Sequence, residues 1–301
     1  RSVIMISFKP LSIEDKELFN RFLNPYTFST CEYSFTNLYL WKKGCNIEYA
    51  ILNDTLIIKK VDFDHSSHFM QPIGYKKENL KELVDELIKY KEENDLDYLF
   101  KDVEEPFLLD LKEIYKDKLI IEEDRDNADY IYLKEDLIKL SGRKFHGKKN
   151  HYNAFIKKYQ YKAVPITEDI IGDCMKAAKE WCHKNDCKGY ILYELYGIQE
   201  LLKNMNKLDF IGMAVYVDDK ISAFTIGEKV NKDMAIIHIE KADSNIRGLY
   251  AYINKTFVEE YLNDVTYINR EQDLGIDGLR KAKLAYNPNK IEMKYSVKTT
   301  S

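Results

Sequence analysis

Carboxylates and cations follow one another near the end of the chain, in a pattern that could bind a zwitterion. The polar residues are expected on a short strand, a loop and a short helix: Asn269, Glu271, Asp273, Arg280, Lys281 and Lys283. Residues three apart on a helix share a face, so Arg280 and Lys283 should point together. The carboxylates would hold an ammonium group and the cations a carboxylate or phosphate. An internal salt-bridge network fits the same residues equally well.

A second polar group follows the strand expected over residues 234–240. Glu240 and Asp243 fall at its carboxyl end, where a carboxylate could orient and deprotonate an amine. Capping of the next helix is the alternative role for Asp243. Arg247 and Gly248 then partly resemble the Arg/Gln-x-x-Gly-x-Gly/Ala loop with which GNAT-type N-acyltransferases bind the pyrophosphate of coenzyme A. Here the loop has one glycine and a shorter spacing.

A basic run lies in the middle of the chain. Eight basic residues and no acid occur between residues 137 and 167, directly after a stretch (81–136) with 20 acidic and 9 basic residues. Arg143, Lys148 and Lys149 lead into an expected helix, whose amino end would favour an anion. A cofactor pyrophosphate, the end of a tRNA or a lipid phosphate would fit. A solvated surface that balances the acidic stretch is the alternative.

Composition bounds the class of protein. The 301 residues carry 46 Lys and Arg against 50 Asp and Glu, and 45% are hydrophobic. This excludes a disordered chain, a collagen-like chain and a bulk polycation. At about 150 residues per domain, two domains are expected. The change from acidic to basic residues indicates the boundary between them, which gives domains at residues 5–130 and 131–301. We expect the active cleft in the second domain.

The five cysteines are Cys31, Cys45, Cys174, Cys182 and Cys187. Their odd number and the absence of a Cys-x-x-Cys pair predict reduced thiols, no bound metal and a cytoplasmic location. No apolar run reaches the roughly 18 residues that a membrane span needs, so no integral membrane association is expected. The oligomeric state is left open.

Hydrophobic periodicity predicts a mixed α/β protein. Helices are expected at 12–24, 79–93, 149–159, 170–184, 198–206, 250–262 and 278–283. Strands are expected at 48–52, 55–59, 129–133, 210–217, 220–230, 234–240, 266–269 and 291–297. Three consecutive antiparallel-looking strands followed by a helix and another strand suit an acyltransferase-type sheet with helices on both sides.

The motifs together resemble a known family. The string from Asn269 through Glu-Gln-Asp-Leu-Gly and Arg-Lys-Ala-Lys to Tyr286-Asn-Pro, preceded by His238-x-Glu-Lys-Ala-Asp, is similar to the C-terminal-like family of phosphatidylglycerol lysyltransferases. The segment from Glu32 to Trp41 fits the same group. These proteins are similar in architecture to Fem-type aminoacyl transferases. The resemblance implies two tandem GNAT-like domains, each a mixed sheet flanked by helices.

The resemblance also implies an activity and site residues. In the membrane relatives, aminoacyl-tRNA donates an amino acid to a lipid hydroxyl. Glu271 and Lys283 match the family motif as the acid and the base, and Asp243 and Arg247 match its loop loosely. This chain lacks the transmembrane helices of those relatives and the coiled-coil insertion with which some Fem proteins hold tRNA.

The sequence therefore predicts an acyl or aminoacyl transferase that uses aminoacyl-tRNA or acyl-CoA as a co-substrate, with no tightly bound cofactor, and an amine or hydroxyl as acceptor. Glu271 or Glu240 would orient the amine, and Lys283 or the backbone near Gly248 would stabilise the oxyanion. The remaining candidates are assigned to substrate or to donor phosphate: Asp243, Arg247, Asn269, Asp273, Arg280 and Tyr286 to substrate, and Arg143, Lys148, Lys149 and Gly248 to phosphate. The alternative is a non-catalytic binding protein for tRNA, an amino acid or a nucleotide. A serine hydrolase is disfavoured because no Gly-x-Ser-x-Gly motif occurs.

Overall fold

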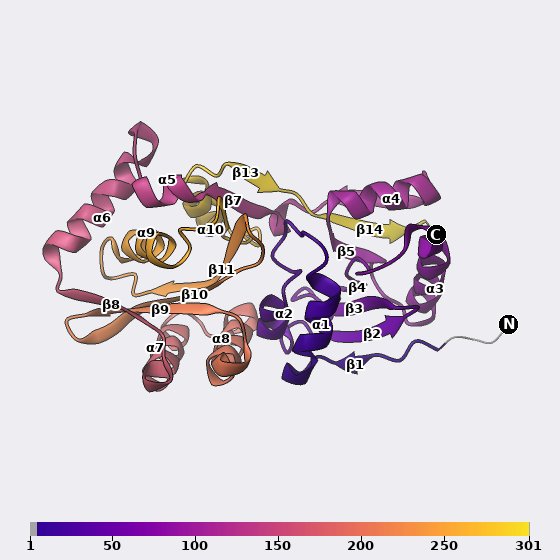
Figure 1. Cartoon of the computed structure of the whole chain (residues 1–301), viewed down its shortest axis with the longest axis horizontal. Coiled ribbons are helices and arrows are strands. Elements are labelled where there is room, and N and C mark those ends of the chain that lie inside the picture. The colour runs from indigo at the N-terminus through magenta and orange to yellow at the C-terminus, as the bar shows by residue number, and fades with distance from the viewer. Residues whose placement is uncertain (1–4, 301) are drawn as a thin grey trace. The chain divides into compact units, whose positions relative to one another are not determined.

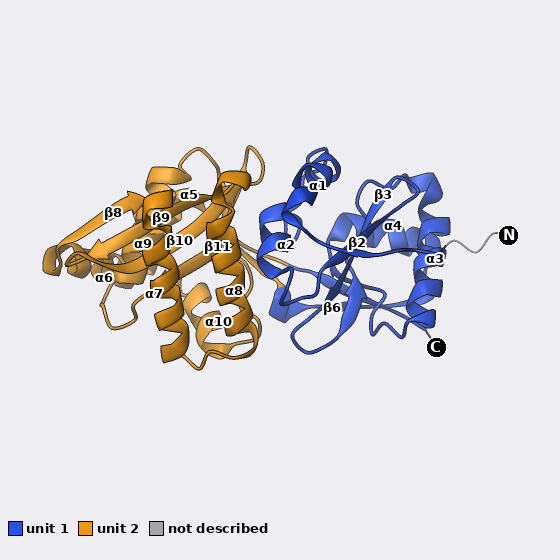
Figure 2. Ribbon diagram, turned by 90° about the horizontal axis from the view of Figure 1, so that it is seen from below, with its two compact units in different colours: residues 1–127, 293–301 blue, residues 128–292 orange. Residues whose placement is uncertain are grey.

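The computed structural model describes residues 5–300, which divide into two compact units (Figure 2). The second unit spans residues 128–292, and the first unit takes in the residues before and after it. The expected boundary near residue 130 falls close to this division. The last strand, expected in the second domain, instead lies in the first unit.

The first unit is built on a seven-stranded sheet in the order β1-β2-β3-β4-β5-β14-β6. Its strands are β1 (Lys9–Pro10), β2 (Glu48–Leu52), β3 (Thr55–Val61), β4 (Ser67–Phe69), β5 (Phe100–Val103), β6 (Leu119–Glu123) and β14 (Tyr295–Thr299). Its helices are α1 (Lys16–Leu23), α2 (Phe35–Trp41), α3 (Leu80–Glu93) and α4 (Glu105–Tyr115). Apolar residues of α3 and α4 form one core with the sheet.

The second unit has a seven-stranded sheet in the order β13-β7-β12-β11-β10-β9-β8. Its strands are β7 (Asp129–Leu133), β8 (Tyr161–Pro165), β9 (Ile211–Val217), β10 (Lys220–Lys229), β11 (Met234–Ala242), β12 (Tyr267–Asn269) and β13 (Lys290–Glu292). Its helices are α5 (Lys134–Lys139), α6 (His146–Lys158), α7 (Ile171–Lys184), α8 (Gly189–Lys203), α9 (Leu249–Tyr261) and α10 (Asp277–Leu284). In Figure 1, α7 and α8 cover one face of this sheet and α9 covers the other.

Short 3-10 helices connect several of these elements: Ile13–Asp15, Lys77–Asn79, Arg125–Asn127, Arg143–Phe145, Glu168–Ile170 and Met205–Lys207.

The two sheets share one pattern. In each sheet, neighbouring strands are antiparallel except for one parallel pair, which is β4 with β5 in the first sheet and β11 with β12 in the second. Four strands lie on one side of the junction within this pair and three on the other. The first sheet also takes in a strand from outside its consecutive run, because β14 lies between β5 and β6, whereas the second sheet consists of the consecutive strands β7 to β13 with β7 between β12 and β13. The expected mixed α/β class is confirmed.

Several element boundaries differ from expectation. The helix expected from residue 198 begins at Gly189, nine residues earlier. The single strand expected at 291–297 is two strands, β13 and β14, which belong to different sheets. The hairpin of β2 and β3 is as expected, with Asn53 and Asp54 both in the left-handed region at the turn.

The prediction of five reduced thiols was wrong. Cys182, near the end of α7, and Cys187 form a disulfide, because the chain turns back after the helix and brings their Cα atoms to 4.9 Å. Cys31, Cys45 and Cys174 are buried free thiols. Among residues 5–300, no helix combines the length and the apolar character that crossing a bilayer requires.

Candidate active site in the second unit

The parallel strands β11 and β12 position the candidate site. Their backbone register runs from Met234–Tyr267 to Ile236–Asn269. Beyond this point side chains connect the two segments, His238 to Glu271 and Glu240 to Arg270. Because parallel strands run in the same direction, the residues that follow both strands collect at one end of the sheet.

A β-bulge directs the side chains of β11. In the pairing of β10 with β11, the register skips His238, which has no opposite residue on β10. The bulge requires glycine at position 227, since a Cβ atom there would lie 2.7 Å from the carbonyl oxygen of Ile236. A bulge shifts the alternation of a strand by one residue. Glu240 therefore faces α9, where it accepts a hydrogen bond from Asn254.

His238 is a buried cation held by two carboxylates. Its Nε2 lies 2.7 Å from Glu228 Oε1 and its Nδ1 lies 2.9 Å from Glu271 Oε2. Burial opposes the charged form, but Glu271 and Glu228 raise the pKa of His238 to about 10. The imidazolium therefore donates from both nitrogens at neutral pH, and it cannot serve as a general base there. Its role is to hold Glu271 in place.

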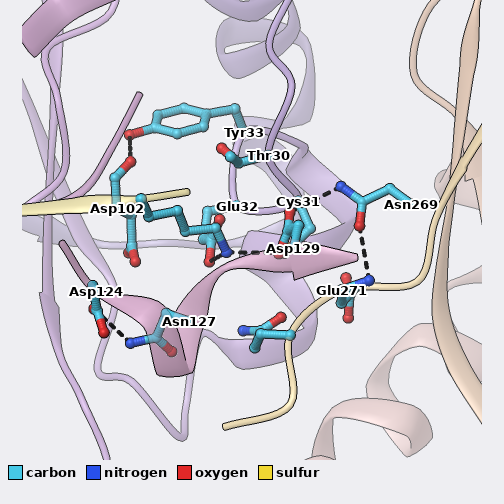
Figure 3. Close-up of polar contacts among 12 residues, drawn as sticks. Thr30, Cys31, Glu32, Tyr33, Asp102, Asp124, Asn127, Asp129, Asn269 and Glu271 are labelled. Carbon is cyan, nitrogen blue, oxygen red and sulfur yellow. Dashed lines mark hydrogen bonds and ion pairs between the residues drawn. The ribbon is translucent and has the colours of Figure 1, made fainter. Parts of the chain in front are cut away.

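Hydrogen bonds hold the backbone of Glu271 as well as its carboxylate. Glu271 has a φ of +63°, a conformation that costs a non-glycine residue energy. The buried Asn269 side chain accepts a hydrogen bond from the Glu271 N–H at 2.7 Å and donates one to Asp129 Oδ2 at 2.8 Å (Figure 3). Asn269 therefore holds the backbone of Glu271, and through it the Glu271 carboxylate, in position.

A second network surrounds Glu240. Its Oε1 accepts a hydrogen bond from Arg270 Nη2 and its Oε2 accepts one from Asn254 Nδ2, both at 3.0 Å. Burial opposes the charge on Arg270, but Glu240 raises its pKa. The guanidinium lies 4.6 Å from the ring centroid of Tyr286 and 5.4 Å from that of Tyr132.

The cations of α10 stabilise the loop between β12 and that helix. Lys283 Nζ donates to the carbonyl oxygens of Arg270 and Gln272, each at 2.6 Å. Arg280 Nε donates to buried Asp273 at 2.8 Å, and the Tyr130 hydroxyl donates to the same carboxylate. Burial favours neutral Asp273, but these hydrogen bonds keep its pKa well below the usual range.

The candidate phosphate residues separate into two groups. Lys148 is half-buried on α6, with its Nζ 4.6 Å from the ring centroid of Tyr286, and burial together with Arg270 lowers its pKa. Arg143 and Lys149 are exposed. Gly248 has a φ of +84°, and a Cβ atom there would lie 2.1 Å from the carbonyl oxygen of His151. Gly248 therefore allows α9 to pack closely against α6.

The loop before α9 stands apart from these networks. Asp243 accepts a hydrogen bond from the Asn245 N–H at 3.0 Å, which is a local turn. Arg247 is exposed. Among residues 5–300, no described side-chain contact links Asp243 or Arg247 to Glu240, Glu271 or Lys283.

Sequence reasoning assigned no role to four residues of these networks, Glu228, His238, Asn254 and Arg270, although His238 begins one of the family motifs. His238 and Glu240 lie two apart on an expected strand, and Arg270 lies between two selected residues, so weak signals existed. Glu228 and Asn254 carried none, because their roles depend on the pairing of β10 with β11 and on the packing of α9.

The fold is that of the tandem GNAT proteins, in which two mixed sheets each carry flanking helices. The structure is similar to a tandem GNAT protein of the clavulanic acid biosynthesis pathway, with a TM-score of 0.52, 9% identity and coverage of 97% of each chain. It is also similar to L-PGS of Bacillus licheniformis, with a TM-score of 0.65, 15% identity and coverage of 95% of this chain and 93% of the other.

The particular family follows from the sequence. The family model for the C-terminal region of phosphatidylglycerol lysyltransferase matches residues 23–298, so the chain belongs to that family of transferases. A conserved protein of unknown function from Bacteroides thetaiotaomicron is 36% identical, with a TM-score of 0.89 and coverage of 98% of this chain and all of the other. An uncharacterised protein of Mycoplasmoides gallisepticum is 27% identical over 180 residues, which span 57% of this chain and 56% of that protein.

Proposed function

We propose that the second unit moves an aminoacyl or acyl group from an activated donor to an amine or hydroxyl acceptor. One observation carries the proposal. Glu240 lies near the end of β11 and Glu271 lies just after β12, and each is held by a buried cation, Arg270 or His238. Such preorganised charge, rather than a covalent intermediate, is what acyl transfer between two bound substrates requires.

The reaction assigns a role to each group. The acceptor nitrogen or oxygen bonds to the donor's acyl carbon, the bond from that carbon to its leaving oxygen or sulfur breaks, and the acceptor's proton passes to the leaving atom. Glu271 is the carboxylate placed to relay that proton, since His238 is already protonated. Lys283 supports the transfer by holding the loop that carries Arg270, because its ammonium is bound to two backbone carbonyls.

The structure supports aminoacyl-tRNA over acyl-CoA as the donor. Gly248, the candidate pyrophosphate residue, lies in tight contact with the backbone of α6 at the amino end of α9. The exposed lysines of α6, Lys149, Lys157 and Lys158, offer a surface for backbone phosphates instead. The family description names a lysyltransferase, so lysyl-tRNA is the first donor to test and phosphatidylglycerol the first acceptor.

Donor release tests the proposal. The purified chain would be incubated with a total aminoacyl-tRNA pool or with acetyl-CoA, each with and without phosphatidylglycerol vesicles or a panel of amines. We expect acceptor-dependent release of free tRNA and no release of free coenzyme A. Acceptor-dependent release from acetyl-CoA alone would assign the donor to the other class, and release from neither donor would contradict transferase activity.

A binding function without turnover is the second candidate, favoured by the run of eight basic residues from 137 to 167. It predicts tRNA affinity that falls steeply with salt, because each phosphate contact releases a counterion. Tight, salt-dependent binding of tRNA together with no acceptor-dependent release would favour this candidate over the transferase.

A further inference from the structure

A disulfide joins the end of α7 to the start of α8. Cys182 lies in the last turn of α7 and is 6% exposed, whereas Cys187 is partly exposed two residues before α8 begins. Their bond closes a short loop, so it stabilises the fold less than a disulfide between distant residues would. Its partial exposure also leaves it open to attack by a thiol. These properties are typical of a reducible disulfide.

The loop around Cys187 depends on the bond more than Cys182 does. Asp186 and Gly189, on either side of Cys187, both have a φ of +55°. This region costs energy for a residue other than glycine, and the disulfide helps to hold Asp186 there. Cys182 keeps a favourable contact without the bond, because its Sγ lies 3.8 Å from the carbonyl oxygen of Ile191 and a thiol donates weakly at that distance. Reduction therefore releases Cys187 while the buried Cys182 retains an acceptor.

The start of α8 faces the end of β11, next to the candidate active site. Glu194 of α8 forms a salt bridge with Lys241, which directly follows Glu240 on β11. Adjacent residues of a strand point to opposite faces, so Glu240 faces α9 while Lys241 faces α8 (Figure 1). Burial opposes the charge on Lys241, but Glu194 raises its pKa. The disulfide thus anchors the segment that brings Glu194 to Lys241.

We propose that the Cys182–Cys187 disulfide is a redox switch that controls the contact between Glu194 and Lys241, and that its substrate is a dithiol. One thiolate of the dithiol attacks Cys187, the more exposed sulfur, the S–S bond breaks, and Cys182 leaves as a thiolate that takes up a proton. The second thiolate then displaces Cys187 from the mixed disulfide. Two electrons and two protons pass from the dithiol to the chain, and the dithiol becomes a cyclic disulfide.

Reduction changes the surroundings of Lys241 through α8. Once the bond is broken, the first turn of α8 loses its covalent link to α7, and Glu194 is held less firmly against the end of β11. The Lys241 ammonium then loses support for its charge, so the amine deprotonates more readily and reacts faster. This inference goes beyond the proposed transfer and does not depend on it, so its test needs neither a donor nor an acceptor.

Equilibration of the native chain with dithiothreitol, followed by alkylation and mass spectrometry, tests the redox step. In a Trp41→Phe background Trp181 is the only tryptophan, and it precedes Cys182 directly. A disulfide quenches a neighbouring indole, so the fluorescence of Trp181 should rise on reduction. We expect the folded chain to be reduced without denaturant and to regain the bond in oxidised glutathione. A bond that resists dithiothreitol until the chain unfolds would overturn the switch.

Limited labelling with an amine-reactive ester tests the coupling to Lys241, whose side chain is 34% exposed and within reach of the reagent. We expect Lys241 to be labelled about 10-fold faster in the reduced chain, which is the change that one pKa unit gives. Lys255, whose ammonium binds Glu259 on α9, provides a matched lysine–glutamate pair and should be labelled equally in both states. Equal labelling of Lys241 in both states would overturn the switch.

Three variants connect the labelling to the named residues. Under oxidising conditions Cys187→Ser should be labelled at Lys241 as fast as the reduced chain. Glu194→Gln should be labelled fast in both states, because its side chain no longer supports the charge of Lys241. Cys174→Ala, which removes a buried free thiol from the same helix, should keep the redox dependence. Thermal unfolding would check that each variant is folded. Slow labelling of Lys241 in a folded Cys187→Ser variant would overturn the switch even if the bond is reducible.

Discussion

At the scale of single residues, the site depends on charges that are fixed by partners rather than by solvent. His238 is fully buried and lies between two carboxylates, and Arg270 is held against Glu240 beneath two tyrosine rings. A buried charge is tolerated only when it is paired and hydrogen-bonded. Each network therefore locks one carboxylate at the strand ends.

The protonation of His238 predicts a pH-dependent stability. Because its pKa is about 10 in the folded chain and near 6.5 when unfolded, the stabilisation is complete below about pH 6.5 and is lost as the pH rises through about 10. The free energy of unfolding should fall by at most about 1.4 kcal/mol per pH unit between these limits. Urea unfolding at pH 7, 8 and 9 measures this slope.

His238→Gln should lower stability at pH 7 and flatten this dependence. The exposed His146 provides a matched control, since His146→Gln should change neither the stability nor the slope. An unchanged slope in His238→Gln would show that His238 is not the buried cation described here.

The sequence revealed the carboxylates of the site better than their partners. Glu240 and Glu271 could be selected because acids at the ends of strands are visible in the pattern. Glu240, the partner of Arg270, lies 30 residues before it in the sequence. The contact between His238 and Glu228 exists only because β10 pairs with β11. Local spacing therefore could not predict either ion pair. The roles expected of Arg280 and Lys283 changed once their acceptors, Asp273 and backbone carbonyls, were seen.

At the scale of elements, α9 connects the site to its support. Asn254 projects from α9 to Glu240, and Gly248 at the start of the same helix lies against the backbone of α6. A helix that must pass so close to another needs glycine at the contact. The packing of α9 against α6 therefore fixes the position of Asn254 relative to the sheet.

Two glycine substitutions test this packing in opposite directions. Gly248→Ala should destabilise the protein by about 2–4 kcal/mol, because its Cβ would overlap the His151 carbonyl and its φ is positive. Gly147→Ala on α6 meets no atom within 4 Å and should stabilise by about 0.5–1 kcal/mol. Urea unfolding measures both. A Gly248→Ala variant as stable as the native chain would contradict the contact.

Element prediction succeeded where the hydrophobic period was clear. The helix α3 and the strands β9, β10 and β11 have apolar faces at regular spacing, and they occur close to the expected positions. The start of α8 was missed because the buried residues of this helix begin only at Leu195, so its first residues show no buried apolar face. The disulfide was missed because the turn that brings Cys182 to Cys187 lies in the loop after α7, where hydrophobic spacing gives no signal.

At the scale of the whole molecule, the first unit depends on a strand from outside its consecutive run. The strand β14 pairs with both β5 and β6, and Lys294 just before it is fully buried 2.5 Å from Glu32 Oε1 in the same unit. Sequence order alone assigns the last strand to the second domain. Only the long-range pairing shows that it completes the first sheet.

Removal of residues 293–301 should therefore unfold part of the first unit. The strand β6 would lose its neighbour, and Glu32 would keep a buried charge without its lysine. Hydrogen exchange of β5 and β6 amides would accelerate markedly, while a shorter deletion of residues 300 and 301 should leave them protected. Unchanged exchange in the longer deletion would contradict this topology.

Proton relay by Glu271, held in place by His238, is the step on which the proposed acyl transfer depends. Single-turnover release of tRNA from aminoacyl-tRNA, with acceptor in excess, measures it most directly in the native chain, in Glu271→Gln and in Glu259→Gln, an exposed control on α9. We predict that Glu271→Gln slows release by about 100-fold or more while Glu259→Gln does not. Equal rates in the native chain and a folded Glu271→Gln variant would contradict the claim.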